Sequence, residues 1–223
     1  ALAICVEYND RYEQARTYHQ LGMVAQEQRQ WAQAEQHYQQ ALAIYVEYND
    51  RYAQASTYHQ LGMVAQEQRQ WAQAEQHYQQ ALAIYVEYND RYAQASTYHQ
   101  LGIVAEEQRQ WAQAEQHYQQ ALAIKIEYND RYAQVSTYHQ LGIVAEEQQQ
   151  WPQAREYFLT ALSIGVEFKD EYRIGTRLES LARLWRASGD AGLPAAVAVV
   201  LGITPEEAEA RLRAAGGTAE AAE

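Results

Sequence analysis

The feature that most constrains this chain is a block of 40 residues that recurs along it. Residues 41–80 and 81–120 differ at two positions only, and residues 1–40 and 121–160 carry the same block with further substitutions. A chain of near-identical units of this length does not form one central core, because each unit contacts only its neighbours. The sequence therefore predicts a linear array of stacked supersecondary units.

Within one block the apolar and small residues recur with the spacing of two amphipathic helices. In the second copy the two faces are Tyr58, Leu61, Gly62 and Ala65, and then Ala74, Tyr78, Ala81 and Leu82. Pro152 follows Trp151 in the fourth copy, and proline is tolerated in the first turn of a helix. We therefore expect one helix over about residues 51–68 and a second over 71–88, with Gly62 and Ala74 allowing close approach.

The order Tyr58-x2-Leu61-Gly62-x2-Ala65, followed by Ala74-x3-Tyr78-x2-Ala81, resembles the tetratricopeptide repeat pattern. Tyr58 stands where tryptophan is common, Ala65 where tyrosine is common, and the period is 40 residues instead of about 34. Such long repeats resemble those of kinesin light chains and, still more, the sensor arrays of bacterial signal-transduction ATPases. The resemblance covers residues 1–188 and implies an all-α fold, a right-handed α-solenoid of about four and a half stacked antiparallel hairpins.

The two ends of the chain differ from the regular blocks. Residues 189–215 are expected to form a helical C-terminal cap, with a separate docking module as the alternative. Its short apolar helix should end at Gly202, and the capping box from Thr204 to Glu207 should open a final helix that ends near Ala214. Residues 216–223 are predicted to be a frayed tail.

At the other end, the segment from Ala1 to Asp10 matches the end of a second helix without its first helix. The chain is therefore expected to be a fragment of a longer protein. Uncovered apolar residues at such an end predict self-association through the array ends.

Composition narrows the classes of partner. The net charge of −12 and the isoelectric point near 5.0 disfavour nucleic acid and anionic membranes, which both require clustered Lys and Arg. The longest apolar run, residues 195–201, is far shorter than the ~20 residues of a membrane-spanning helix. Cys5 is the only cysteine, so no internal disulfide is possible and a cytoplasmic location is expected.

The resemblance implies that the first helix of each hairpin lines a concave groove. Its inward positions combine methionine or isoleucine with histidine and carboxylates, which predicts a protein or peptide ligand; a plain solvated face is the alternative. These positions are Ser56, His59, Met63, Gln66 and Glu67; Ser96, His99, Ile103, Glu106 and Glu107; Ser136, His139, Ile143, Glu146 and Glu147; and, in the first copy, Arg16, His19, Met23, Gln26 and Glu27.

The ladder of groove histidines raises the question of a metal site. Two ligands of one ion must each lie about 2 Å from it. We expect an intervening second helix to hold equivalent first helices well over ~10 Å apart, so no shared ion is predicted. A second histidine set (His37, His77 and His117) is expected to face outward, and pH sensing is a further alternative. No catalytic constellation and no cofactor motif occurs in the sequence, so an enzyme is not predicted.

Charge changes along the expected groove suggest what a ligand carries. Gln26 and Gln66 give way to Glu106 and Glu146, so the groove becomes more acidic before Arg183 and Arg186 reverse the sign. A ligand is thus expected to carry basic residues opposite the glutamates and an acidic group near Arg183. The alternative is that the two arginines pair with Glu146 and Glu147. The chain is accordingly predicted to be a protein-binding scaffold or sensor array; the alternative is a structural spacer or self-assembly module.

Overall fold

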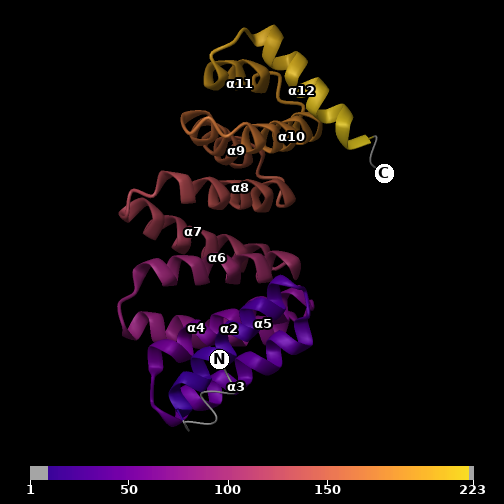
Figure 1. The fold of residues 1–223 in the computed structure, drawn as a ribbon. Coiled ribbons are helices and arrows are strands. Elements are labelled where there is room, and N and C mark those ends of the chain that lie inside the picture. Colours follow the sequence, from indigo (N-terminus) through magenta and orange to yellow (C-terminus); the bar gives the residue numbers. More distant parts are fainter. Residues whose placement is uncertain (1–9, 221–223) are drawn as a thin grey trace. The chain divides into compact units, whose positions relative to one another are not determined.

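The computed structural model describes residues 10–220, and the side chains of residues 10–217 (Figure 1). Within this range every regular element is a helix, and the predicted all-α fold is confirmed. The predicted half hairpin at residues 1–9 lies outside the described residues. In the order of the chain, the helices are α2 (Arg11–Glu27), α3 (Trp31–Glu47), α4 (Arg51–Glu67), α5 (Trp71–Glu87), α6 (Arg91–Glu107), α7 (Trp111–Glu127), α8 (Arg131–Glu147), α9 (Trp151–Glu167), α10 (Glu171–Ser188), α11 (Leu193–Leu201) and α12 (Pro205–Glu220).

The chain forms two compact units, residues 1–110 and residues 111–223. In the first unit α2 pairs with α3 and α4 with α5, and α6 packs on α5. In the second unit α8 pairs with α9, α7 packs on α8, and α10 packs on α9. We call the first helix of each hairpin helix A (α2, α4, α6, α8, α10) and the second helix B (α3, α5, α7, α9).

Helix A begins at an aspartate in each copy. Asp50 is the N-cap of α4, and its carboxylate accepts a hydrogen bond from the backbone nitrogen of Ala53 at 2.9 Å. The equivalent aspartates Asp10, Asp90, Asp130 and Asp170 cap the other A helices in the same way. A capping carboxylate satisfies a backbone N–H that has no partner within the helix, so this aspartate defines where each repeat begins.

Both kinds of helix end at a residue in the left-handed conformation. After α4 this residue is Arg69, with φ of 57°, and after α3 it is Asn49, with φ of 53°. The nitrogen of Gln70 then donates to the carbonyl of Ala65 at 2.9 Å, and the nitrogen of Arg69 to that of Gln66, also at 2.9 Å. This pair of bonds is the Schellman motif, which satisfies the last carbonyls of the helix and reverses the chain.

The glycine of helix A creates the close contact that joins the two helices of a hairpin. A Cβ placed on Gly62 would lie 2.6 Å from ring atoms of Tyr78 on α5. Tyr78 is fully buried and packs with Ala65, Ala74 and Leu101, so its ring also contacts the next hairpin. The predicted close approach at Gly62 is confirmed, and stacking of hairpins buries the aromatic ring.

Successive A helices of the first unit contact each other directly. Nδ1 of His19 lies 3.2 Å from Oγ1 of Thr57, and Nδ1 of His59 lies 3.1 Å from Oγ1 of Thr97. The expectation that an intervening helix B separates the A helices was therefore wrong. Within the first unit the A helices of neighbouring hairpins share one layer, so α4 contacts both its own helix B, α5, and the next helix A, α6.

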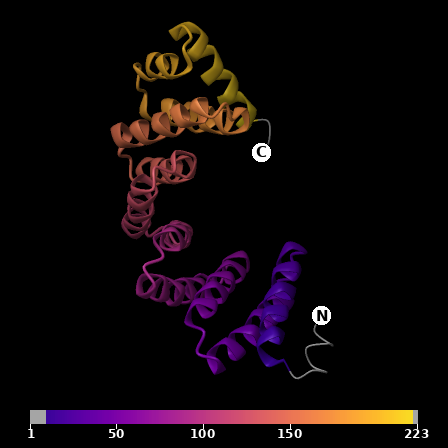
Figure 2. The ribbon, with the colours of Figure 1, turned by 60° about the vertical axis from the view of Figure 1, so that its left-hand side comes forward.

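The C-terminal helices continue the core of the second unit. Leu193 and Val197 of α11 and Leu212 of α12 are fully buried in one cluster with Phe158 and Leu181 of the array. Figure 2 shows α12, in yellow, descending obliquely toward the orange helices, and α12 packs against α10. The predicted capping box is present: the Thr204 nitrogen donates to Oε2 of Glu207 at 2.9 Å, and the Glu207 nitrogen donates to Oγ1 of Thr204 at 3.2 Å.

One predicted boundary in this region was wrong. The final helix does not end near Ala214 but continues to Glu220, so part of the predicted frayed tail is helical. Packing explains the difference, because a Cβ on Gly216 would lie only 3.6 Å from Ala182 and 3.5 Å from Arg186 of α10. Contact with α10 thus offsets the low helix propensity of two consecutive glycines.

Candidate functional site

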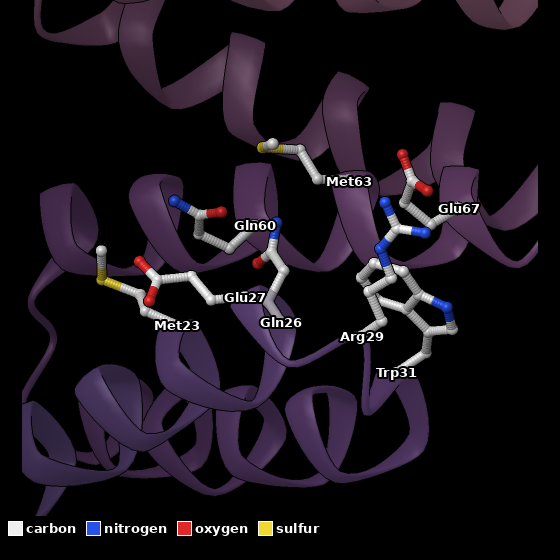
Figure 3. Close-up of a pocket in the computed structure, with 8 residues that line it drawn as sticks. All are labelled: Met23, Gln26, Glu27, Arg29, Trp31, Gln60, Met63 and Glu67. Carbon is white, nitrogen blue, oxygen red and sulfur yellow. The ribbon is translucent and has the colours of Figure 1, made fainter.

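A pocket of about 510 Å³ lies between the first two hairpins of the first unit. It is formed by the last turns of α2, the turn that follows, the start of α3 and the inner side of α4. Figure 3 shows Arg29, Trp31 and Glu67 together at one end of the pocket and Met23 at the other. The lining residues are Met23, Gln26, Glu27, Arg29, Trp31, Gln60, Met63 and Glu67.

The same pocket recurs one repeat further along the first unit. A second pocket of about 270 Å³ lies between α4 and α6, at positions that correspond to those of the first. Isoleucine replaces methionine at one of these positions. The lining residues are Gln66, Glu67, Arg69, Trp71, Ile103 and Glu107. The 40-residue period therefore repeats a recessed surface as well as a fold.

Several residues predicted for the groove line these pockets, namely Met23, Gln26, Glu27, Met63, Gln66, Glu67, Ile103 and Glu107. The serines that were predicted for the groove line neither pocket. Ser56 instead donates from its hydroxyl to the carbonyl of Ala53 at 3.0 Å, and Ser136 donates to that of Ala133 at 3.3 Å. Ser96 is exposed and lines neither pocket.

The groove residues predicted from the sequence did not include Arg29, Arg69, Gln60 or the two lining tryptophans, Trp31 and Trp71. A signal for the arginines exists in the repeat itself. In the first unit the turn after helix B has asparagine in the left-handed conformation, whereas the turns after α2 and α4 have arginine there, at φ of 56° and 57°. In the hairpin of α8 and α9, Gln149 and Lys169 take these two places. Asparagine adopts the left-handed conformation more readily than arginine. The presence of arginine at this position therefore suggests that its side chain has a role.

The groove histidines are packed between helices. The ring of His59 lies 5.3 Å from that of Tyr78, and its Nδ1 faces Thr97. Burial lowers the pKa of His59 to about 4, and it also lowers the pKa of His19. These side chains are therefore neutral near pH 7 and join neighbouring A helices. Among the described residues, no three His, Cys, Asp or Glu side chains form a group able to hold a metal ion.

The second histidine set lies on helix B. Nδ1 of His77 lies 3.3 Å from Oε1 of Gln80, and its ring stacks at 6.1 Å on Tyr58 of helix A. Burial lowers the pKa of His77, partly opposed by its contact with Gln80. These contacts give the second set a packing role as well.

The glutamine of the groove supports a buried tyrosine. The hydroxyl of Tyr38 donates to Oε1 of Gln26 at 2.8 Å, and that of Tyr78 donates to Oε1 of Gln66 at 3.0 Å. Each glutamine thereby satisfies a phenol whose ring is fully buried in the core. The amide group is at the same time part of the pocket lining, so this position connects the core with the recessed surface.

In the second unit the corresponding arrangement is an ion pair. Phe158 occupies the tyrosine position and has no hydroxyl, and Glu146 accepts three hydrogen bonds from the guanidinium of Arg183, at 2.7, 3.0 and 3.1 Å. This pairing is the alternative weighed for Arg183 in the sequence analysis. Glu146 and Arg183 are thus engaged with each other.

The glutamates at the ends of the two helix types differ in their partners. At the ends of helices B, Glu47, Glu87 and Glu167 form ion pairs with Arg11, Arg51 and Arg131 of the preceding helix A, at 3.0, 3.3 and 3.1 Å. At the ends of helices A in the first unit, Glu27, Glu67 and Glu107 form no ion pair with any described residue. These three carboxylates line the two pockets, where they are accessible to a cationic group.

Stacked pairs of antiparallel helices, joined by the glycine–tyrosine contact, define a helical-hairpin repeat protein. The family model of the tetratricopeptide repeat matches residues 1–47 and 53–127. The chain belongs to the tetratricopeptide repeat family. None of the curated proteins compared with the chain is significantly similar to it.

Solved structures with a similar fold include arrays of the long-repeat type. A putative kinesin light chain from Podosopora anserina with nearly identical TPR-like repeats is 18% identical, with a TM-score of 0.71 over 93% of this chain and 97% of that chain. A Signal Transduction ATPase with Numerous Domains protein with a tetratricopeptide repeat sensor, from Pyrococcus horikoshii, is 15% identical, with a TM-score of 0.74 over 96% of this chain and 37% of that chain.

A third similar structure is the Rap protein complexed with Competence and Sporulation Factor. It is 18% identical, with a TM-score of 0.64 over 91% of this chain and 55% of that chain. The present chain thus spans about half of that protein and little more than a third of the ATPase. At these identities the likeness concerns the fold. No helix among residues 10–220 has the length and apolar character required to cross a membrane.

Proposed function

We propose that this chain is a non-catalytic array that binds a protein or peptide on the face formed by its A helices. The observation that carries the proposal is the recurrence of one pocket in consecutive hairpins. A surface that repeats with the fold offers a partner several equivalent contacts, whose contributions add along the array. The Rap protein, which has a similar fold, has been crystallised with a bound factor, which supports a binding role for such arrays.

The chemistry of the pockets indicates which segment of a partner they fit. Glu27, Glu67 and Glu107 present carboxylates without an ion-pair partner among the described residues, while Met63 and Ile103 supply apolar contact. A segment with lysine or arginine side chains next to apolar ones complements this surface. In the second unit, Ile143 and Glu147 occupy the corresponding positions and are part of the same proposal.

Peptide selection followed by charge neutralisation tests the proposal. Peptides from a random library are selected on the full chain, and their dissociation constants are measured by fluorescence anisotropy. We expect basic residues among the selected peptides, and a three- to tenfold weaker affinity for Glu67→Gln, about 0.7–1.4 kcal/mol. Gln76→Lys changes the net charge by the same amount at an exposed position of α5 and should leave the affinity unchanged.

Two outcomes would contradict the proposal. Selection could yield no peptide that binds the full chain, or the selected peptides could bind Glu67→Gln and the parent equally well. Either result would favour the second candidate function, a structural spacer or self-assembly module in which the length of the array matters and the pockets do not.

A further inference from the structure

Helix α10 lacks the threonine of a histidine–threonine contact that recurs between the A helices of the first unit. His19 faces the hydroxyl of Thr57, and His59 faces that of Thr97, in each case across 38 residues of sequence. In the second unit the residue that follows His139 by the same 38 positions is Arg177, on α10. An arginine, which has no acceptor atom, therefore occupies the place where a threonine hydroxyl meets the histidine in the first unit.

His139 is left with an unsatisfied nitrogen. Its ring packs at 5.5 Å against the ring of Phe158, as His59 packs against Tyr78. Its Nδ1 is buried and forms no hydrogen bond with any described residue. Burial, together with the charges of Arg177 and Arg183, lowers the pKa of His139 to about 3, so the side chain is neutral near pH 7.

Arg177 is a buried cation with an unsatisfied donor. The residue is only 8% exposed. Its Nη1 donates to Oγ1 of Thr176 at 3.0 Å, but its Nε is buried and donates to no described residue. Burial lowers the pKa of Arg177 to about 10, which still leaves the guanidinium charged near pH 7.

The charge of Asp170 acts on Arg177, but Asp170 and Glu146 are each engaged by other groups. Asp170 accepts from the backbone nitrogen of Arg173 at 3.0 Å and from the hydroxyl of Tyr132 at 3.1 Å, and it pairs with Nε of Arg173 at 3.1 Å. Glu146 is held by Arg183. A buried guanidinium that lacks a dedicated counter-charge is costly, and a water molecule can satisfy its hydrogen bond but not its charge.

We propose that Arg177 and His139 bind a small monovalent anion between α8 and α10. Nε–H of Arg177 and Nδ1–H of the neutral imidazole are the two donors, and the single positive charge of the pair matches one negative charge. Chloride and a carboxylate group share this chemistry. The site belongs to the second unit and does not depend on the peptide-binding function proposed above.

The repeat provides a matched variant for the test. Arg177→Thr installs the residue found at the equivalent positions of the array (Thr57, Thr97 and Thr137). The substitution removes the buried charge and restores a hydroxyl opposite His139, so the variant should fold. Arg213→Thr is the control, because it removes an arginine of the same unit whose ion pair with Glu209 lies on the surface.

Thermal unfolding of the full chain measures binding of the anion. Methanesulfonate is replaced stepwise by chloride, or by acetate as the carboxylate probe, at constant ionic strength and pH 7. We expect the unfolding midpoint to rise by about 2–5 °C for each tenfold increase of the bound anion above its dissociation constant. The rise should persist in Arg213→Thr and vanish in Arg177→Thr.

The outcomes separate the sources of the anion and decide the proposal. A rise with chloride alone identifies an inorganic ion, whereas a rise with acetate as well shows that the site accepts a carboxylate. If the midpoint of the parent depends on neither anion, the two orphaned donors are hydrated and the proposal is wrong. It is equally wrong if Arg177→Thr keeps the full dependence, because the anion then binds elsewhere.

Discussion

At the scale of single residues, the groove histidines show how packing changes a titratable side chain. His59 occupies a position that the tetratricopeptide pattern directs toward the groove, and its imidazole is nevertheless enclosed by Tyr78 and the next helix A. The cost of desolvating an imidazolium then favours the neutral ring. His19 and His59 are therefore inter-helix contacts that tolerate acid poorly.

This reading predicts how stability depends on pH. The pKa of His59 is about 4 and that of His139 about 3 in the folded chain, against an ordinary value near 6.5 when unfolded. The unfolded state therefore binds more protons below pH 6.5, so the free energy of unfolding should fall as the pH is lowered from about 6.5 to 5, above the range of most carboxylates. Denaturant titrations over this range measure the slope.

The double variant His59→Gln, His139→Gln supplies the comparison for that titration. It should show a clearly shallower slope than the parent between pH 6.5 and 5, whatever its absolute stability. Identical slopes for the two proteins would show that these histidines titrate normally in the folded chain and are not enclosed as described.

At the scale of the elements, one glycine decides how closely the two helices of a hairpin approach. The ring of Tyr78 lies where the Cβ of residue 62 would be, and Phe158 contacts Gly142 in the same way. The aspartate caps and the left-handed turns fix the length of each helix, and the glycine contact then fixes the distance between them. These local features are shared by successive copies, which is why the hairpins of the array resemble one another.

We predict opposite effects for two glycine-to-alanine substitutions. Gly62→Ala places a Cβ 2.6 Å from the Tyr78 ring and should destabilise the chain by about 1–3 kcal/mol. Gly175→Ala meets no atom within 4 Å and should stabilise α10 by up to about 1 kcal/mol through helix propensity. Equilibrium denaturation in urea compares them; two effects of the same sign would disprove the assigned contact.

At the scale of the whole molecule, the last elements close the hydrophobic core of the second unit. Leu193, Val197 and Leu212 are fully buried, and they pack with Phe158 and Leu181 of the array. A repeat array needs such a terminal element, because its last hairpin otherwise presents an apolar face to water. We therefore propose that α11 and α12 stabilise the array as a cap.

Truncation tests the role of this segment. A chain that ends at Asp190 lacks α11 and α12 and exposes the cluster around Phe158, so it should unfold at a temperature several degrees lower and associate at micromolar concentrations. Differential scanning calorimetry and light scattering measure the two effects. A chain that ends at Gly217 keeps the buried residues and is the control. Equal midpoints and scattering for the two truncations would show that the segment is not a cap.

The sequence alone determined the helical class, the repeat and most helix boundaries of this protein. These properties depend on contacts within one block: aspartate caps, helical spacing, and proline in a first turn all act over a few residues. The capping box at Thr204 and the close contact at Gly62 could be predicted for the same reason, since each involves local geometry or a small residue at a fixed position in the pattern.

Only the tertiary structure decided the contacts between blocks. It placed A helices side by side, so that His59 meets Thr97, and it extended α12 to Glu220 through packing on α10. It also paired Arg183 with Glu146 and left Arg177 buried without a partner for its Nε among residues 10–217. The side-chain contacts between stacked hairpins depend on the distance between the helices and on the side-chain rotamers. The repeat in the sequence specifies neither of these.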